Sequence, residues 1–404
     1  MADALKPKDE AEVVEALNDA LSGGKPLELV GHGSKRGIGR AAQTDRTLDV
    51  SVISGVTLYE PEELVLSARA GTPLAEIEKL LADKNQELAF EPPDLGPLLG
   101  GAANAATLGG TLAVNLSGPR RIKAGAARDF ALGVRAVSGR GEIFKAGGRV
   151  VKNVTGYDLP KLLAGSWGTL AVMTELTIKV LPRAEDVATV LVLGLTDARA
   201  AEAMTAGMGS SNEVSGAAHL PPKVAAKIPV AAVAKAGRAV TALRLEGIAP
   251  SIAYRRQKLE DILKPIGTLG ALDAEDSRAF WRAVRDVMPF VARKERAVWR
   301  ISATATAGAA IGTKLVTETG AEVLYDWAGG LLWIEMPDGA PREAVVRGVL
   351  GAQGHATLMR ADASQRAGDV FEPLEPSLAA LAKRVKESFD PKGLLNPGRM
   401  YAGI

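Results

Sequence analysis

The 404-residue chain contains no cysteine and only three histidines. Without cysteine it can form no disulfide, no thiolate zinc site and no cysteine-ligated iron–sulfur cluster, and it has no cysteine nucleophile. The histidines are His32, His219 and His355, and they lie too far apart in the sequence to show metal-ligand spacing. We therefore expect no metal site in this chain.

A large excess of one charge and a long apolar run are also missing. The formal net charge is +2, whereas proteins that bind nucleic acids usually carry a much stronger basic excess. No apolar run is long enough to span a bilayer, and the N-terminal residues lack the apolar core of a signal peptide. We therefore expect no nucleic-acid partner, no transmembrane segment and a cytoplasmic location.

A chain of this length is too long for one ordinary core, so two domains are expected. In the first part, Val13, Val14, Leu17 and Leu21 fall on one helical face, and a strand, PLELV, follows. The stretch 47–73 is typical of strands broken by turns, and Thr72 and Pro73 then open a helix.

Residues 92–119 differ from their surroundings, because they are rich in Gly, Ala and Pro and show no clear period. They are too apolar for a flexible linker, which predicts a buried irregular loop with a short helix. A hairpin over 132–146 and a short helix around 158–165 follow, and then a strand that Pro182 ends.

The character of the sequence changes after Pro182. Up to about residue 365, strands alternate with amphipathic helices, which predicts an α+β domain with helices on one face of a sheet. A polar loop, a helix and the tail DPKGLLNPGRMYAGI complete the chain. We therefore expect domains at 1–183 and 184–365, with a C-terminal segment at 366–404.

The segment GHGSKRGIGR directly follows the PLELV strand. Glycines at 31, 33, 37 and 39 allow successive backbone N–H groups to turn inward and hold an anion such as a pyrophosphate, with Ser34 as a further donor. The segment matches neither the G-x-G-x-x-G pattern nor a P-loop. Taken alone, it is better explained by an ordinary loop after an edge strand.

The segment ATLGGTLAVNLSGPRR mixes small polar groups with apolar ones. Gly109 and Gly110 permit close approach of the backbone to a ligand, and Thr107, Asn115 and Ser117 supply short polar side chains. A flavin needs such a mixture of apolar surface and hydrogen-bonding groups. The alternative is a glycine-rich bend in a tight sheet.

A third polar segment is KNVTGYDLPKLLAGSWGTLAV. Lys152, Asn153, Tyr157 and Asp158 cluster before the short helix, where each is also explained as a cap or turn residue.

Together and in this order, these segments resemble the flavoproteins of the vanillyl-alcohol-oxidase and p-cresol-methylhydroxylase type. The RDFALGVRAVSGRGE hairpin and the tail FDPKGLLNPGRMY belong to the same pattern, which covers about the first 183 residues and returns at the C-terminus. The motifs SGPRR, VVKNVTGYD and NPGRMY are most similar to the E subunits of bacterial glycolate oxidases.

The resemblance implies a fold of two α+β lobes that hold FAD between them, covered by a ferredoxin-like α+β cap. It also implies a set of cofactor-binding residues. These are Gly31, His32, Gly33, Ser34, Lys35, Pro92, Thr107, Gly109, Gly110, Ser117, Gly118, Arg121, Asp129, Gly165, Gly168, Val172 and Asn396. Arg121 has a direct rationale as well, because a guanidinium makes charge-assisted hydrogen bonds to a phosphate.

Two departures from the family pattern matter. Some members attach FAD through a histidine just before the loop serine, but Gly33 stands there and His32 comes one residue earlier, so we expect non-covalent FAD. Related 2-hydroxy-acid dehydrogenases also carry a late H-x-G-D-G-N-x-H motif, which this chain lacks. Oxidation of a hydroxy acid needs a base, and the sequence identifies no convincing one.

Other charged residues allow two interpretations each. Arg282, Arg285 and Arg300, with Trp281 and Trp299, could form a carboxylate-binding wall in the cap, or a solvated helix face and a strand that packs its tryptophans. His355 is better explained as a core or strand-edge histidine than as a base, and the run 293–296 as solvated surface or a partner contact.

Three functions fit the sequence. The first is an accessory flavin subunit of a glycolate-oxidising complex that produces glyoxylate. The resemblance implies that its partners are a related flavin subunit and an iron–sulfur subunit, and that the complex can hold it at the inner membrane. The second is a self-sufficient FAD dehydrogenase of a small 2-hydroxy acid such as D-lactate. The third is a structural subunit with a vestigial flavin.

Overall fold

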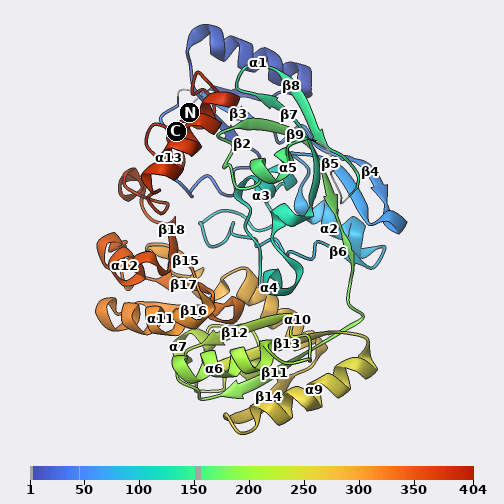
Figure 1. The fold of residues 1–404 in the computed structure, drawn as a ribbon, viewed down its shortest axis with the longest axis vertical. Helices are drawn as coiled ribbons and strands as arrows, with labels where there is room; N and C mark the ends of the chain where they lie inside the picture. The colour runs from blue at the N-terminus through green and yellow to red at the C-terminus, as the bar shows by residue number, and fades with distance from the viewer. Residues whose placement is uncertain (1–2, 45, 151–155) are drawn as a thin grey trace.

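The computed structural model describes residues 3–44, 46–150 and 156–404 (Figure 1). Lys152 and Asn153 lie outside these residues, so their predicted role as cap or turn groups is not addressed. No helix in the described ranges is long and apolar enough to cross a membrane.

The N-terminal part begins with the predicted amphipathic helix, α1 (Glu10–Gly23). Asp9 caps its first turn by accepting a hydrogen bond from the backbone N–H of Glu12, and Gly24 ends it in the left-handed conformation with φ of 61°. Val13 and Leu17 are fully buried. The helix packs through this face onto a small core beneath two sheets.

Two sheets form the framework of this part. A parallel sheet has the order β1 (Asp3–Leu5), β3 (Arg46–Asp49), β2 (Leu27–Val30). An antiparallel sheet has the order β4 (Val56–Glu60), β5 (Val65–Arg69), β9 (Ala171–Lys179), β7 (Ala131–Ser138), β8 (Ile143–Gly147). The predicted hairpin is confirmed as β7–β8, and the strand expected before Pro182 is the central strand β9.

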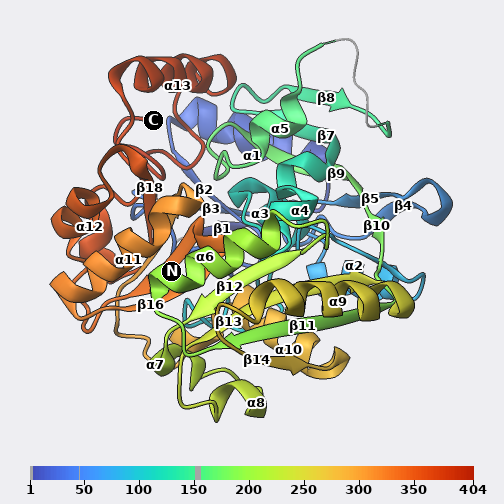
Figure 2. The same cartoon turned by 60° about the horizontal axis from the view of Figure 1, so that its bottom comes forward.

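Short helices and an irregular segment connect these sheets. The helices are α2 (Leu74–Ala82), α3 (Leu108–Val114), α4 (Arg121–Ala124) and α5 (Leu159–Leu163). Residues 92–106 form no helix or extended strand, yet Leu95 and Leu98 are almost fully buried. The predicted irregular loop with a short helix is therefore present, buried around Leu95 and Leu98 but exposed at residues 100–104. Figures 1 and 2 show α3 and α4 between the two halves of the molecule.

The second half is built on one eight-stranded antiparallel sheet, here called the cap sheet. A two-residue ladder between β10 (Leu181–Pro182) and β6 (Gln86–Glu87) precedes it in the chain. The order in the cap sheet is β14 (Thr268–Leu272), β11 (Asp186–Leu193), β13 (Val240–Gly247), β12 (Gly216–Leu220), β16 (Glu322–Asp326), β17 (Leu331–Glu335), β15 (Val298–Ala303), β18 (Gly354–Arg360). The mixed α+β architecture is thus confirmed.

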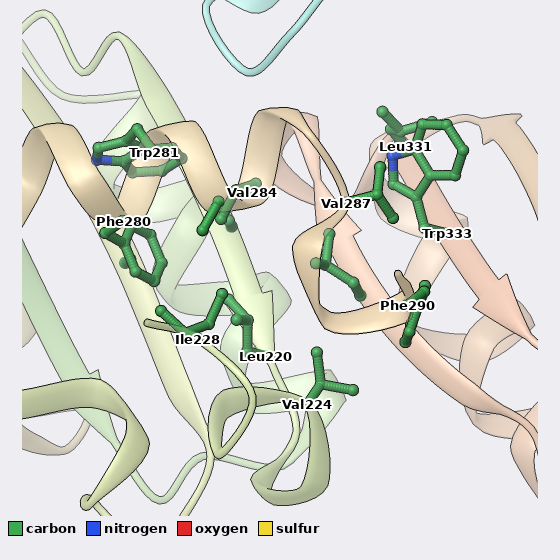
Figure 3. Packing of buried hydrophobic residues seen from close by; sticks show 14 of the residues in the cluster. Leu220, Val224, Ile228, Phe280, Trp281, Val284, Val287, Phe290, Leu331 and Trp333 are labelled. Atoms are coloured by element: carbon green, nitrogen blue, oxygen red, sulfur yellow. The ribbon is translucent and has the colours of Figure 1, made fainter. Parts of the chain in front are cut away.

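Helices cover both faces of the cap sheet, not the single face that the sequence predicted. The outer face carries α6 (Asp197–Met208), α9 (Ala249–Leu263), α11 (Ala305–Thr319) and α12 (Glu343–Leu350), which lie mainly in front of the strands in Figure 2. The inner face carries α7 (Pro222–Ala225), α8 (Ala231–Ala234) and α10 (Ala274–Arg285). Phe280 and Trp281 of α10 share one apolar cluster with Leu331 and Trp333 of β17 (Figure 3).

The inner face also packs on the irregular loop of the first half. Leu95, Leu98 and Val114 belong to the same apolar cluster as Trp333. Beside it, Arg244 of β13 donates hydrogen bonds of 2.7 and 3.0 Å to the carboxylate of Glu91. Burial alone would raise the pKa of Glu91, but Arg244 and Arg120 outweigh it and hold that pKa at about 2. A paired charge therefore joins the two halves.

The C-terminal segment returns to the first half, as the resemblance implies. After α13 (Pro376–Phe389), the N–H of Leu27 donates to the carbonyl of Leu394 at 2.7 Å. The buried Lys386 ammonium donates to Asp390 and to the carbonyls of Thr169 and Leu395. The boundaries at 183 and 365, taken as limits of separable units, stay predictions.

Candidate functional site

A pocket opens in the first half, where β2, α3 and the C-terminal tail meet. Ten of the predicted cofactor-binding residues line it. They are Gly31, His32, Gly33, Ser34, Lys35, Thr107, Gly109, Gly110, Gly168 and Asn396. Segments separated by more than 200 residues in the sequence therefore line one cavity, here called the flavin pocket.

The loop after β2 has the backbone that an anion site requires. Gly33 has φ of 72°, a value that glycine adopts without strain, and the N–H of Arg36 closes a turn on its carbonyl at 3.0 Å. Within the described ranges, no backbone N–H from His32 to Lys35 donates to another residue of the chain. These unsatisfied donors at the pocket wall fit the oxygens of a pyrophosphate.

Two glycines let the other walls close up to the pocket. A Cβ on Gly31 would lie 2.6 Å from Oγ1 of Thr107, and a Cβ on Gly109 would lie 2.8 Å from that of Ala70. Thr107 caps α3, since its hydroxyl accepts a hydrogen bond from the N–H of Gly110 at 3.2 Å. The loop after β2, the turn after β5 and the start of α3 therefore approach one another closely because these positions lack side chains.

Asn396 ties the tail to both sides of the pocket. Its Oδ1 accepts a hydrogen bond from the N–H of Leu29 at 2.8 Å, and its Nδ2 donates to the carbonyl of Trp167 at 2.8 Å. Its φ of 44° is left-handed, a conformation that asparagine tolerates better than most residues. A Cβ on the adjacent Gly168 would lie 2.8 Å from Nδ2. The tail therefore contributes to the pocket by fixing β2 against the turn before β9.

Cationic side chains complete the polar part of the pocket. Burial lowers the pKa of Lys35 to about 8, although Asp94 partly offsets the effect. Burial also lowers the pKa of Arg399 to about 10, with Glu28 opposing and Arg366 and Arg36 adding to the shift. The Nε of Arg399 is buried without a hydrogen-bond partner in the described structure. Such an orphaned donor fits a site that an anionic ligand completes.

The remaining lining is apolar. It comes from Val30, Val50, Ala70, Ala113, Val114, Trp167 and Met173. FAD needs both kinds of surface, donors and cations for the diphosphate and apolar walls for its rings. The residues present therefore fit this cofactor.

Seven of the predicted residues lie outside this lining. They are Pro92, Ser117, Gly118, Arg121, Asp129, Gly165 and Val172. Several have structural roles. Ser117 accepts from the N–H of Ala127 at 3.0 Å, and Asp129 accepts from the N–H of Ala126 at 2.8 Å. Arg121 lies over the indole of Trp327, 4.7 Å from the ring centroid, and does not line the flavin pocket.

Residues that the sequence did not single out also line the flavin pocket. Arg36 and Arg399 bring charge, and Trp167 occupies a left-handed turn with φ of 56°. Arg399 stands in the NPGRMY tail, three residues after Asn396, so a signal for it was present. Apolar residues in and beside β5 and β9 also line the pocket, such as Ala70 and Met173. Their sequence pattern is the same as that of buried core residues, so it could not identify them as pocket residues.

The predicted carboxylate wall of Arg282, Arg285, Arg300, Trp281 and Trp299 is not formed as a unit. Arg300 is buried on the inner face of the cap sheet, whereas Trp299 packs in the outer core against α11 and α12. Neighbouring strand residues point to opposite faces, which separates the two. Trp281 lies beneath Arg244 and donates to Thr189 at 2.9 Å, and Arg285 pairs with Asp286.

The remaining candidates have ordinary structural roles. His355 lies exposed on the edge strand β18, as the strand-edge interpretation expects. His219 is buried, with ring nitrogens 2.9 Å from the Thr241 hydroxyl and 3.3 Å from the Asp197 carboxylate. Arg293 is not a free surface group, since it pairs with Glu322 and Glu335. Among the described residues, no cluster of His, Asp and Glu could hold a metal ion.

Comparison with known proteins agrees with this geometry. A family model described as FAD binding domain matches residues 2–147, and a model of the C-terminal domain of FAD-linked oxidases matches residues 370–400. The chain is 35% identical to glycolate oxidase subunit GlcE of Escherichia coli, over 97% of each chain. It is 34% identical to a D-lactate dehydrogenase of Archaeoglobus fulgidus, over 47% of this chain and 40% of that protein.

A solved structure supports the fold alone. That of p-cresol methylhydroxylase with substrate bound is similar with a TM-score of 0.73 at 15% sequence identity, over 98% of this chain and 88% of the other.

Proposed function

The chain belongs to the FAD-linked oxidoreductase family that includes GlcE of glycolate oxidase, and we propose that it is a flavin subunit of a complex that oxidises glycolate to glyoxylate. The observation that carries this proposal is the similarity to GlcE along the whole of both chains, together with the flavin pocket. The similarity includes the second half of the chain, which packs against the flavin-binding part.

FAD, when bound, supplies an acceptor for the hydride that leaves the alcohol carbon. The chain itself would hold the diphosphate through the N–H groups of residues 32–35 and the charges of Lys35 and Arg399. The apolar walls keep water from the rings. The attachment is non-covalent in this proposal, because Gly33 stands where related proteins place the histidine that bonds to the flavin.

Electron transfer and assembly are the next part of the proposal. The chain has no cysteine for iron–sulfur ligation and lacks the histidine motif that related dehydrogenases use near the hydroxyl. A related flavin subunit would supply substrate oxidation, and an iron–sulfur subunit would carry electrons onward one at a time. The complex would be cytoplasmic or held at the inner membrane through its partners.

A self-sufficient dehydrogenase of D-lactate type is the second candidate, because a named D-lactate dehydrogenase is 34% identical. That similarity covers less than half of this chain, so it says little about the cap sheet. A structural subunit with a vestigial flavin is less well supported, since the pocket keeps its glycines, its free N–H groups and its cations.

Co-purification tests the assembly. The tagged chain is co-expressed with the neighbouring genes of its own organism, and the isolated material is analysed for subunits, FAD and iron. We expect a second flavin chain and an iron-containing chain, with more than one FAD for each copy of this chain. A homogeneous preparation of this chain alone, carrying all of the glycolate-oxidising activity of the lysate, would contradict the proposal.

A further inference from the structure

Among the described residues, two arginines on the inner side of the cap sheet have no carboxylate within salt-bridge distance. Arg300 of β15 is 7% exposed, and Arg121 of α4 is half-buried. Their guanidinium carbons lie 5.1 and 4.7 Å from the ring centroid of Trp327. In the described parts of the chain, neither side chain makes a hydrogen bond to another residue, and neither has a nitrogen that is fully buried and unpartnered, so their N–H groups keep access to solvent. Trp327 is itself held in place, because its Nε1 donates to the carbonyl of Gly118 at 3.0 Å.

Other buried arginines of the same layer have partners within the fold. Arg244 is paired with Glu91, and Arg360 donates to Glu335 and to the carbonyls of Leu98 and Phe290. A buried charge without such a partner is strongly unfavourable, because burial removes its water and nothing replaces it. Arg300 has no such hydrogen-bonded partner, and within the described chain only the Trp327 ring and the charge of Asp326 offset its burial.

The nearest acid does not neutralise the pair. Burial raises the pKa of Asp326 to about 7, although Arg244, Arg300 and a hydrogen bond from the N–H of Trp327 oppose the shift. Even when it is ionised, Asp326 supplies one negative charge against two guanidiniums. Burial and Arg121 lower the pKa of Arg300 to about 10, which still leaves it charged. The cluster of Arg121, Arg300 and Asp326 therefore keeps a net positive charge.

The position of this cluster relates it to the flavin pocket. Arg300 lies opposite Trp333 and Thr357 in the ladder of the cap sheet. Trp327 and Trp333 share an apolar cluster with Val114, and Val114 also lines the flavin pocket. Val114 of α3 therefore lines the flavin pocket and also belongs to the apolar cluster that contains Trp327, the residue beneath both arginines.

We propose that Arg121 and Arg300 bind the carboxylate of a small 2-hydroxy or 2-oxo acid beside the flavin pocket. The proposal rests on the proposed function for the choice of acid, and on the unpaired guanidiniums for the choice of carboxylate. Guanidiniums are suited to this group, since they make charge-assisted and often bidentate hydrogen bonds to it. The chain therefore has its own site for the acid and is not only a relay for electrons.

The test is ligand binding by the FAD-loaded chain, without turnover. Oxalate, a small dicarboxylate that resembles a 2-hydroxy acid and carries no oxidisable C–H bond, is titrated while the flavin absorption spectrum and the heat of binding are recorded. Arg300→Gln and Arg121→Gln should each weaken oxalate binding at least about tenfold, and Arg300→Lys should restore part of the affinity. Arg256→Gln should have no effect, because Arg256 is a surface residue of α9 paired with Glu260.

Two further measurements separate carboxylate binding from a role in folding and from a role in holding FAD. Arg300→Met should leave the melting temperature of the ligand-free protein unchanged or higher, because it removes an unpaired buried charge. A marked fall would show that the charge is compensated within the fold. The affinity for FAD should also be unchanged in Arg300→Gln. Loss of FAD with unaltered oxalate binding would overturn the proposal and assign the arginines to the flavin.

Failure here can be told apart from failure of the proposed function. Oxalate binding needs no partner subunit and no oxidation, so a wild-type chain that binds FAD but no oxalate refutes the carboxylate site alone. Co-purification with a flavin chain and an iron-containing chain would still stand.

Discussion

Asn396 offers the sharpest perturbation of the flavin pocket, because a single side chain links two of its walls. In Asn396→Ala, the N–H of Leu29 and the carbonyl of Trp167 lose their partners. Each buried backbone group left unpaired costs about 1–3 kcal/mol. Leu29 and Trp167 are only partly buried, so we place the combined cost near the lower end, at about 2 kcal/mol.

That cost should be measured as stability and as cofactor affinity. If binding must restore the lost arrangement, about 2 kcal/mol corresponds to roughly a thirtyfold weaker affinity for FAD. The assay is the quenching of FAD fluorescence by apoprotein, with denaturant unfolding in parallel. Asn396→Asp should lower FAD affinity and stability less than Asn396→Ala does. It keeps an oxygen that can accept the hydrogen bond from the N–H of Leu29, and it loses only the bond to the Trp167 carbonyl.

The matched control is Asn85→Ala. Asn85 also has a left-handed backbone, with φ of 53°, but it is exposed and does not line the pocket. Both substitutions place alanine in a left-handed conformation that asparagine adopts more easily. Only Asn396→Ala also removes the hydrogen bonds to Leu29 and Trp167. Equal effects of the two substitutions on FAD affinity would refute the reasoning.

Three further predictions concern the cofactor and one buried acid. Acid precipitation of the holoprotein should leave all yellow colour in the supernatant, and flavin that stays in the pellet would show a covalent bond. Gly33→Val should abolish FAD binding while the far-UV circular dichroism persists, whereas Gly24→Val, at a left-handed helix end away from the pocket lining, should keep FAD. Because burial raises the pKa of Asp326 from 3.8 to about 7, its ionisation destabilises the folded chain progressively as pH rises through that window. Asp326→Asn should therefore gain unfolding free energy relative to the parent between about pH 4 and 7 and then level off, and parallel pH profiles would contradict this.

Local patterns in the sequence were sufficient for most elements of the first half. The period of Val13 and Leu17 identifies α1, and the alternation through Leu176 and Ile178 identifies β9. The loop at 31–35 was recognisable from its glycines, and the resemblance added Asn396, which no local rule would bring to the same cavity. Its partners Leu29 and Trp167 lie 367 and 229 residues away, so only the tertiary fold reveals the contact.

The arginine cluster shows why the rest could not be predicted. Trp299 and Arg300 are adjacent in the sequence and were predicted to belong to one carboxylate-binding wall. Neighbouring residues of a strand point to opposite faces of the sheet, so the two side chains lie apart. The residue that does meet Arg300 is Trp327, which directly follows β16 and sits in a left-handed turn. In the sheet, β17 lies between β15 and β16. Strand order and register decide this contact, and the spacing of the residues along the chain determines neither.

The most direct test of the proposed role is glycolate-dependent reduction of an artificial dye. The FAD-loaded chain is assayed alone and then after assembly with its partner subunits, at equal flavin concentration. A positioned base typically contributes about 10²–10⁴-fold to such a reaction, and this chain lacks the histidine motif of its relatives. We therefore expect turnover by the isolated chain to be at least about a hundredfold slower than by the complex. Comparable turnover by the chain alone would contradict this role and establish a self-sufficient dehydrogenase.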